Sequence, residues 1–308
     1  QKSMNRKRKS VRVRQIAFIF SGCAVVSVLT GFFLMDGVRA KDDVEIIAHR
    51  GAAGKAPENT LASVRQAVED GTDWVEIDVQ ETMDGRIAVI HDSDLMKLAG
   101  NDMKIWDATL EQLQQVDIGS WFSPEFSDER IPALEDVLEA VKGKARLLIE
   151  LKYYGHDQML EQRVVDIVEQ TDMVDRVALM SLKHAGIEKA RSLRPDWPCG
   201  LLSSKTVGDI SSLKMDFLAV NMATTTPGLI RRIHKAEKQV YVWTANDRIS
   251  MSRMMSLGVD GIITDEPELA RQVLMERANL NFSERLLLHA AVLLGRPIPS
   301  KQFRDKSP

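Results

Sequence analysis

The chain has 308 residues, of which 44% are hydrophobic and 28% are charged, which is enough for one globular domain of roughly 250 residues with appendages. The net charge of −3 combines +7 on residues 1–14 with −10 on the remainder. An acidic body argues against nucleic acid as a partner and suits a protein that holds divalent cations with carboxylates.

Residues 1–14 are followed by an uncharged stretch of twenty residues, Ile16–Met35. At about 1.5 Å per residue, such a helix matches a bilayer core of roughly 30 Å. We therefore expect a basic cytoplasmic tail over residues 1–14, a transmembrane helix over 15–36 and a linker over 37–43. The positive-inside rule then places the protein in the cell membrane, with the following domain on the extracytoplasmic side.

A cleavable signal peptide is the alternative to this anchor. Val38–Ala40 resembles a cleavage site, but the apolar stretch is longer than the usual signal core of about 7–15 residues, which favours the anchor. Because the sequence begins with Gln1, the stretch is also compatible with the last of several membrane helices in a longer protein.

Strand-like and helix-like stretches alternate after this segment, which predicts a parallel α/β fold. The predicted strands are Val44–Ala48, Trp74–Val79, Ile87–Ile90, Arg146–Leu151, Val177–Ser181, Cys199–Leu202, Phe217–Val220, Val240–Thr244 and Gly261–Thr264. The predicted helices are Thr60–Asp70, Leu134–Val141, Gln158–Gln170, Ala185–Leu193, Pro227–Glu237, Ile249–Leu257 and Pro267–Arg277.

Nine predicted strands compete for the eight places of a (β/α)8 barrel. Only Thr82–Arg86 links the second strand to the third, which is too short for a helical crossover. We expect a local departure from barrel topology there. The capping box Thr109-Leu110-Glu111-Gln112 predicts at least one helix in the long stretch that follows.

Three acidic residues interrupt otherwise apolar strands. Glu76 and Asp78 are two residues apart in a strand, so both side chains leave the same face, and Glu150 interrupts Leu147–Leu151 in the same way. A Glu-x-Asp pair alone usually marks a solvated strand face. Here the burial of unpaired carboxylates would be costly, and a divalent cation is the economical partner. Oxygen ligands suit Mg²⁺ or Ca²⁺.

Two histidines and two basic residues complete the predicted site. His49 and His91 each follow a predicted strand, and an imidazole pair can deprotonate a nucleophile and protonate a leaving alkoxide near neutral pH. Arg50 offers a phosphate a bidentate fork and Lys152 a point charge. Lys152 can also neutralise the nearby carboxylates, and the two roles are compatible.

Many short motifs occur in the order found in one enzyme family. They are His49-Arg50-Gly51, Pro57-Glu58-Asn59-Thr60, Glu76-Ile77-Asp78, Met83–Arg86, His91-Asp92, Ile131–Leu134, Ile149–Lys152, Val242–Thr244 and Gly258–Asp265. Over residues 44–275 the chain thus resembles the glycerophosphodiester phosphodiesterase family. The resemblance implies a TIM (β/α)8-type barrel of the phospholipase C-like kind over residues 44–278. It also implies a short insertion over 93–130 and a C-terminal extension over 279–308.

The resemblance assigns Glu76, Asp78 and Glu150 to a metal. It implies that a glycerol hydroxyl of the substrate attacks the phosphorus, and that water then opens the cyclic phosphate. Trp243 corresponds to a residue that lines the family's glycerol pocket, although a tryptophan of the barrel core is the equal alternative. Asn59 either orients a site group or, as we favour, caps the helix that begins at Thr60.

We therefore expect a membrane-anchored, metal-dependent enzyme that hydrolyses glycerophosphodiesters to sn-glycerol 3-phosphate and an alcohol. A lysophospholipase D that acts on membrane lipids is an alternative, as is a catalytically silent binding module on the same barrel. The family often has Ser-Phe where Ser181-Leu182 stand, which leaves the preferred head group open. Asp265–Glu268 predicts a helix N-cap with proline in the first turn. Leu286–Gly295 either packs on the barrel or lies at the membrane interface.

Overall fold

The computed structural model describes residues 43–203, 208, 213–281 and 283–284. The predicted transmembrane segment over 15–36 and the apolar stretch Leu286–Gly295 lie outside these ranges. Within the described part of the chain, no helix is both long enough and apolar enough to cross a membrane.

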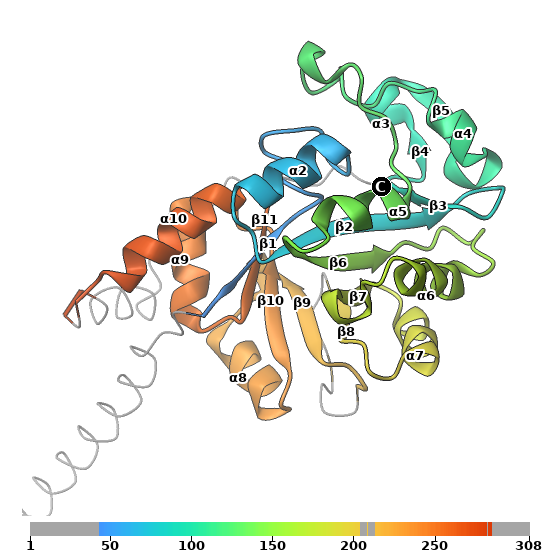
Figure 1. The fold of residues 1–308 in the computed structure, drawn as a ribbon. Helices are drawn as coiled ribbons and strands as arrows, with labels where there is room; N and C mark the ends of the chain where they lie inside the picture. The colour runs from blue at the N-terminus through green and yellow to red at the C-terminus, as the bar shows by residue number, and fades with distance from the viewer. Residues whose placement is uncertain (1–42, 204–207, 209–212, 282, 285–308) are drawn as a thin grey trace, which may run out of the picture.

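Among the described residues, eight parallel strands close into a barrel (Figure 1). Their order is β1–β11–β10–β9–β8–β7–β6–β2, and β2 pairs with β1 to complete the ring. The strands are β1 (Glu45–Ala48), β2 (Trp74–Glu81), β6 (Arg146–Leu151), β7 (Val177–Ser181), β8 (Cys199–Ser203), β9 (Phe217–Asn221), β10 (Gln239–Trp243) and β11 (Gly261–Thr264). The predicted barrel is confirmed, and the carboxyl ends of all eight strands meet at one end of it.

The third of the nine predicted strands, Ile87–Ile90, is the one displaced from the barrel. This strand, β3 (Ile87–Val89), runs antiparallel to β2 and lies outside the parallel ring. The short link Thr82–Arg86 closes as a tight hairpin, in which the Thr82 amide donates to the Arg86 carbonyl at 3.0 Å. The predicted departure from barrel topology therefore occurs because a five-residue link permits only an antiparallel return.

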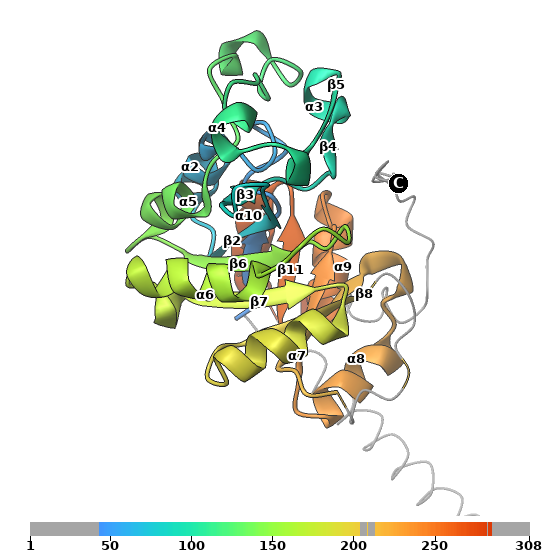
Figure 2. The same cartoon turned by 90° about the vertical axis from the view of Figure 1, so that its right-hand side faces the viewer.

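Helices cover the outside of the barrel, as Figures 1 and 2 show. They are α2 (Leu61–Glu69), α5 (Leu134–Val141), α6 (Leu160–Gln170), α7 (His184–Leu193), α8 (Pro227–Lys235), α9 (Arg248–Leu257) and α10 (Pro267–Ala278). The predicted strands and helices agree with the observed ones to within two residues at each end.

The insertion, residues 93–130, lies beside the carboxyl end of the barrel, at the top of Figure 1. Its elements are β4 (Asp94–Leu95), α3 (Met96–Ala99), β5 (Asn101–Lys104), the 3₁₀ helix η1 (Ile105–Asp107), α4 (Leu110–Leu113) and the 3₁₀ helix η2 (Pro124–Phe126). It has its own apolar cluster, which includes Leu95 and Ile105 and packs against Ile90 after β3. The predicted capping box at Thr109 is confirmed at the start of α4.

Successive residues of each barrel strand alternate between two cores. In β2, Val75 and Ile77 face outward into the layer between the strands and the helices. Trp74 faces inward and joins Phe217, Tyr241 and other residues in a cluster that fills the barrel. The same alternation decides which side chains at the carboxyl end of each strand point into the barrel.

Gly200 in β8 provides a test of how tightly the interior is packed. A Cβ atom at this position would lie 2.0 Å from the Phe217 ring, which is fully buried and cannot move aside. We expect Gly200→Ala to destabilise the fold by about 1–3 kcal/mol and to lower the Tm by about 2–12 °C.

Gly228→Ala in α8 is the matched control, because the nearest atom to a Cβ at this position would be 3.9 Å away. That variant should be neutral or slightly more stable than wild type, since alanine favours a helix more than glycine does. Equal losses in the two variants, measured by thermal denaturation, would contradict the packing argument.

Candidate active site

The predicted site residues gather at the carboxyl end of the barrel, most of them on its inner face. Two-residue alternation connects each inward side chain to a residue of the interior cluster below it: Ile47 below His49, Trp74 below Glu76 and Asp78, Leu148 below Glu150, Tyr241 below Trp243, and Ile263 below Asp265. The strand period thus aims polar groups from five strands into one space.

Glu76, Asp78 and Glu150 form a buried triad of carboxylates. Asp78 and Glu150 are register partners in the neighbouring strands β2 and β6, and Glu76 lies two residues before Asp78. One oxygen from each residue lies within 4.8 Å of the others. The side chains are almost fully buried, so their charges need compensation from nearby cations. An all-oxygen donor set of this kind fits Mg²⁺ or Ca²⁺.

The negative charge of the triad is only partly balanced by nearby positive charges. Burial and the neighbouring Asp78 charge raise the pKa of Glu76 to about 7. Burial and the other two carboxylates raise the pKa of Glu150 to about 8, against the lowering effect of Lys152. Burial also disfavours the Asp78 carboxylate, but His91, Lys152 and Arg50 hold its pKa well below the usual range. The protein's own cations therefore stabilise one charged carboxylate better than three.

Arg50 and Lys152 are the cations that touch the triad. The Lys152 Nζ atom lies 3.1 Å from Glu150 Oε1 and 3.6 Å from Asp78 Oδ1, and the Arg50 Nε atom lies 3.3 Å from Asp78 Oδ2. The Arg50 backbone amide donates to Glu76 Oε2 at 2.8 Å. Lys152 thus pairs with two of the carboxylates, in agreement with the neutralising role that its sequence position allows.

Asn59 does not cap α2, so the favoured interpretation of this residue is wrong. Thr60 is the N-cap, and its hydroxyl accepts from the Ser63 amide. The Asn59 side chain instead donates to Asp78 Oδ2 at 2.9 Å and accepts from the Asp78 amide at 3.1 Å. Asn59 therefore orients a carboxylate of the triad, which is the alternative that its sequence position left open.

His49 is held by a polar chain from the segments that follow β10 and β11. Its Nδ1 atom lies 2.6 Å from Asp265 Oδ1, and Asn246 donates to the other Asp265 oxygen at 2.5 Å. Burial disfavours the imidazolium, but the Asp265 carboxylate outweighs burial and raises the His49 pKa above its ordinary value. The N-cap with proline in the first turn that was predicted within Asp265–Glu268 is confirmed, with Glu266 as the N-cap residue and Pro267 in the first turn of α10.

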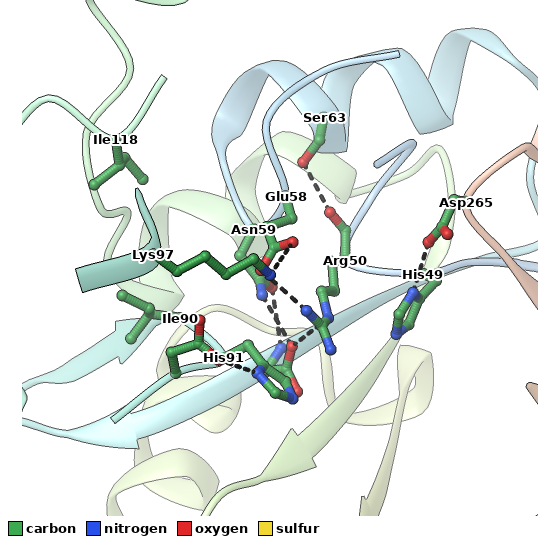
Figure 3. A network of polar contacts seen from close by, with 12 residues as sticks. His49, Arg50, Glu58, Asn59, Ser63, Ile90, His91, Lys97, Ile118 and Asp265 are labelled. Carbon is green, nitrogen blue, oxygen red and sulfur yellow. Dashed lines mark hydrogen bonds and ion pairs between the residues drawn. The ribbon is translucent and has the colours of Figure 1, made fainter. Parts of the chain in front are cut away.

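His91 lies on the other side of the carboxylates, after the displaced strand β3. Its Nδ1 atom is 2.8 Å from Asp92 Oδ1. His91 acts electrostatically on Asp78, whereas His49 acts on Glu76, so the two imidazoles flank the carboxylate pair of β2. Figure 3 shows Arg50 between them. In both histidines Nδ1 contacts a carboxylate oxygen, which fixes the orientation of the ring.

A third cation, Lys97, reaches the edge of the site from the insertion. Lys97 Nζ donates to both oxygens of Glu58, at 3.0 and 2.9 Å, and Arg50 donates to Glu58 Oε1 at 3.0 Å (Figure 3). Glu58 therefore ties the insertion to the arginine that touches the triad.

Trp243 lies half-buried at the end of β10 and packs against the interior cluster. Its indole N–H donates to the Ala219 carbonyl at 3.3 Å. The contacts are those of a core residue, and Trp243 stands at the carboxyl end of β10, the end of the barrel at which the triad lies.

The sequence analysis missed Asp265, Asn246 and Glu58 as parts of the site. Asp265 follows a buried strand in the same way as His49 does, so the same signal was present, but a local capping explanation was preferred. Asn246 and Glu58 lie in loops, where no periodic pattern indicates the direction of a side chain.

The chain is similar to known proteins over most of its length. Residues 49–269 match the model of the glycerophosphoryl diester phosphodiesterase family. YhdW of Bacillus subtilis is 35% identical over 230 residues, which cover 72% of this chain and 95% of the relative. A glycerophosphodiester phosphodiesterase of Caldanaerobacter subterraneus is 33% identical over 233 residues, which cover 72% of this chain and 94% of the relative.

Among solved structures, a phosphodiesterase of Oleispira antarctica in complex with the product sn-glycerol-3-phosphate is similar to this chain. The TM-score is 0.71 at 28% sequence identity, and the match covers 75% of this chain and 96% of the other.

Glu76→Gln tests whether the triad is short of positive charge. A carboxyl group whose pKa is raised from its ordinary value to about 7 stabilises the fold at low pH and loses that contribution as the pH rises through 7. In the presence of a chelator, the wild-type Tm should therefore decrease between about pH 5 and pH 8 more steeply than the Tm of the variant.

Addition of Mg²⁺ or Ca²⁺ at pH 8 should raise the Tm of wild type more than that of the variant, because a ligand that binds only the folded state raises its stability. Wild type should gain Tm, and Glu76→Gln should gain much less. Equal gains in both proteins would remove Glu76 from the metal site.

Asp265→Asn tests the chain that holds His49. The variant should lower the His49 pKa, since it removes the carboxylate that favours the imidazolium. An NMR titration of the histidine ring protons measures this directly. Glu268→Gln is the control. It also removes one negative charge, but Glu268 lies in the first turn of α10 and pairs with Lys55, so this variant should leave the His49 titration unchanged.

Proposed function

The chain belongs to the glycerophosphoryl diester phosphodiesterase family, and on this premise we propose that it hydrolyses glycerophosphodiesters by metal-assisted acid–base catalysis. The products are sn-glycerol 3-phosphate and an alcohol. The observation that carries the proposal is the convergence of three buried carboxylates, two cations and two carboxylate-anchored histidines at one end of the barrel. Such a set has the parts that phosphodiester cleavage needs.

The carboxylate triad is the proposed metal site, with Glu76, Asp78 and Glu150 as its ligands. Mg²⁺ and Ca²⁺ both suit three carboxylates with water and phosphate oxygens in the remaining positions. When bound, such an ion supplies Lewis-acid stabilisation of the negative charge on the phosphoryl oxygens. The raised pKa values of Glu76 and Glu150 agree with this assignment, because they show that the charged carboxylates lack sufficient positive charge nearby.

Arg50 and Lys152 are proposed to hold the phosphate beside the triad. Both are largely buried, so their charges act through a medium less polar than water. They pair with Asp78 and Glu150, which keeps them in position. Their interaction with a phosphoryl group would strengthen as charge develops on its oxygens.

His49 and His91 are the proposed acid–base pair. One imidazole takes the proton from the glycerol hydroxyl as its oxygen bonds to phosphorus, and the other protonates the alkoxide as the second ester bond breaks. Water then opens the resulting cyclic phosphate with the roles exchanged. Asp265 and Asp92 fix the ring orientations, as the carboxylate does in other acid–base triads. Trp243 is proposed to line the glycerol side of the pocket.

The proposal is tested by the release of sn-glycerol 3-phosphate from glycerophosphocholine by the full chain. Turnover should cease in EDTA and return with Mg²⁺ or Ca²⁺, and the ion that restores more activity identifies the better cofactor. Preferred hydrolysis of lysophosphatidylcholine would favour the lysophospholipase D alternative. No turnover of either substrate with both ions present would leave only a binding module.

Single substitutions of the two histidines test their roles. His49→Ala and His91→Ala should each lower kcat by about 10²–10⁴-fold, the usual contribution of positioned proton transfer. The double variant should lose less than the product of the two losses, because both groups serve one reaction. His234→Ala, at a histidine outside the site, is the control. A wild-type rate in either single variant would exclude that histidine from the mechanism.

A further inference from the structure

The insertion contributes a charged side chain, Lys97, to the edge of the proposed site. Lys97 lies in α3 close to Leu95 and Leu98, which are buried in the apolar cluster of the insertion and fix this short helix. The Lys97 side chain is itself 41% exposed, and it extends to the barrel, where it contacts both oxygens of Glu58 (Figure 3). The contact joins residues that are 39 positions apart in the chain.

Glu58 lies between Lys97 and Arg50. Its carboxylate accepts from Arg50 Nη1 at 3.0 Å, and the Nε atom of the same guanidinium lies 3.3 Å from Asp78 Oδ2. The side chains of Arg50, Glu58 and Asp78 are largely buried, so water screens these charges weakly. The single charge of Arg50 therefore faces two carboxylates.

The charge balance around Arg50 affects how strongly this residue can hold an anion. A phosphodiester is negatively charged, so Glu58 and Asp78 both compete with it for the guanidinium. Lys152 helps to balance Asp78, because its Nζ atom lies 3.6 Å from Asp78 Oδ1. Lys97 does the same for Glu58. Without Lys97, Glu58 would present an uncompensated negative charge beside the place proposed for the phosphate.

The charge of Lys97 also acts on a second carboxylate of the site. Burial disfavours the Asp92 carboxylate, but the hydrogen bond and charge of His91, followed by the charges of Lys97 and Arg50, hold the Asp92 pKa below its usual range. Asp92 is the residue that contacts His91 Nδ1. An exposed lysine of the insertion thus influences groups that the proposed reaction uses.

We propose that Lys97 is a positioning residue for phosphate binding, which balances the charge of Glu58 so that Arg50 can act on the phosphodiester. The inference rests on the proposed function and adds to it a role for the insertion. It makes a prediction of sign: loss of the Lys97 charge should weaken the binding of an anionic substrate, and removal of the Glu58 charge should reverse that loss.

Steady-state kinetics of the full chain with glycerophosphocholine test the first part, together with inhibition by the product sn-glycerol 3-phosphate. Lys97→Met keeps the length of the side chain and removes its charge. It should raise both the KM and the inhibition constant of the product by about 3- to 10-fold, the range expected for a partly buried ion pair. The value of kcat should change by less than about twofold, since the lost interaction serves binding. Lys97→Arg, which keeps the charge, should retain most of the wild-type affinity.

The double variant Lys97→Met with Glu58→Gln tests the second part. Glutamine removes the uncompensated charge and keeps an oxygen that can accept from Arg50. The KM of the double variant should therefore be lower than that of Lys97→Met and close to that of wild type. A pair that only holds the insertion on the barrel would give a double variant at least as impaired as the single one, and so would direct contact of Lys97 with the phosphate.

Lys104→Met is the matched control, because Lys104 belongs to the same insertion and is 39% exposed, but pairs with Asp94. It should keep the wild-type KM. A wild-type KM in Lys97→Met, or no rescue by Glu58→Gln, would overturn the inference, while turnover by wild type upholds the proposed function. Absence of turnover by wild type with Mg²⁺ or Ca²⁺ present would overturn the proposed function and the role of Lys97 with it.

Discussion

The burial of three carboxylates between two neighbouring strands is the constraint on which the rest of the site depends. Glu76, Asp78 and Glu150 point inward because the strand period allows no other direction once their apolar neighbours face the helices. Buried charges of one sign repel one another, and water cannot screen them. Arg50 and Lys152 offset part of this charge, and the raised pKa values of Glu76 and Glu150 show that part remains. This imbalance is the reason for which we propose a divalent cation at the triad.

The groups around the triad are held in place by further pairs of opposite polarity. Asp265 and Asp92 each bind a histidine, Asn59 binds Asp78, and Glu58 joins Arg50 to the insertion. Each of these contacts limits the motion of a side chain that the proposed reaction uses, which is how a rigid barrel provides preorganised chemistry. The displacement of β3 is part of the same arrangement. It carries His91 to the side of Arg50 opposite His49 (Figure 3).

Much of this site could be predicted from the sequence because strand periodicity is a local property. The positions of Glu76, Asp78 and Glu150 in apolar strands, and of His49 and His91 after strands, were sufficient to expect them near one another. Asn59 was misjudged, and Asp265 was not expected in the site, for a common reason. Each stands two residues before the first residue of a helix, where capping is the usual role of such residues. The competing partner lies far away in the chain, 19 residues from Asn59 and 216 from Asp265, so no local pattern reveals it.

The sequence by itself determined the alternation of strands and helices, the inward direction of the acidic side chains and the short link that cannot form a crossover, since all three depend on neighbours within a few residues. Tertiary structure decided which strand left the ring and which carboxylate bound which histidine. It also decided that the insertion supplies Lys97 to the edge of the site. These outcomes depend on closure of the barrel, because only the pairing of β1 with both β11 and β2 brings the two ends of the domain together.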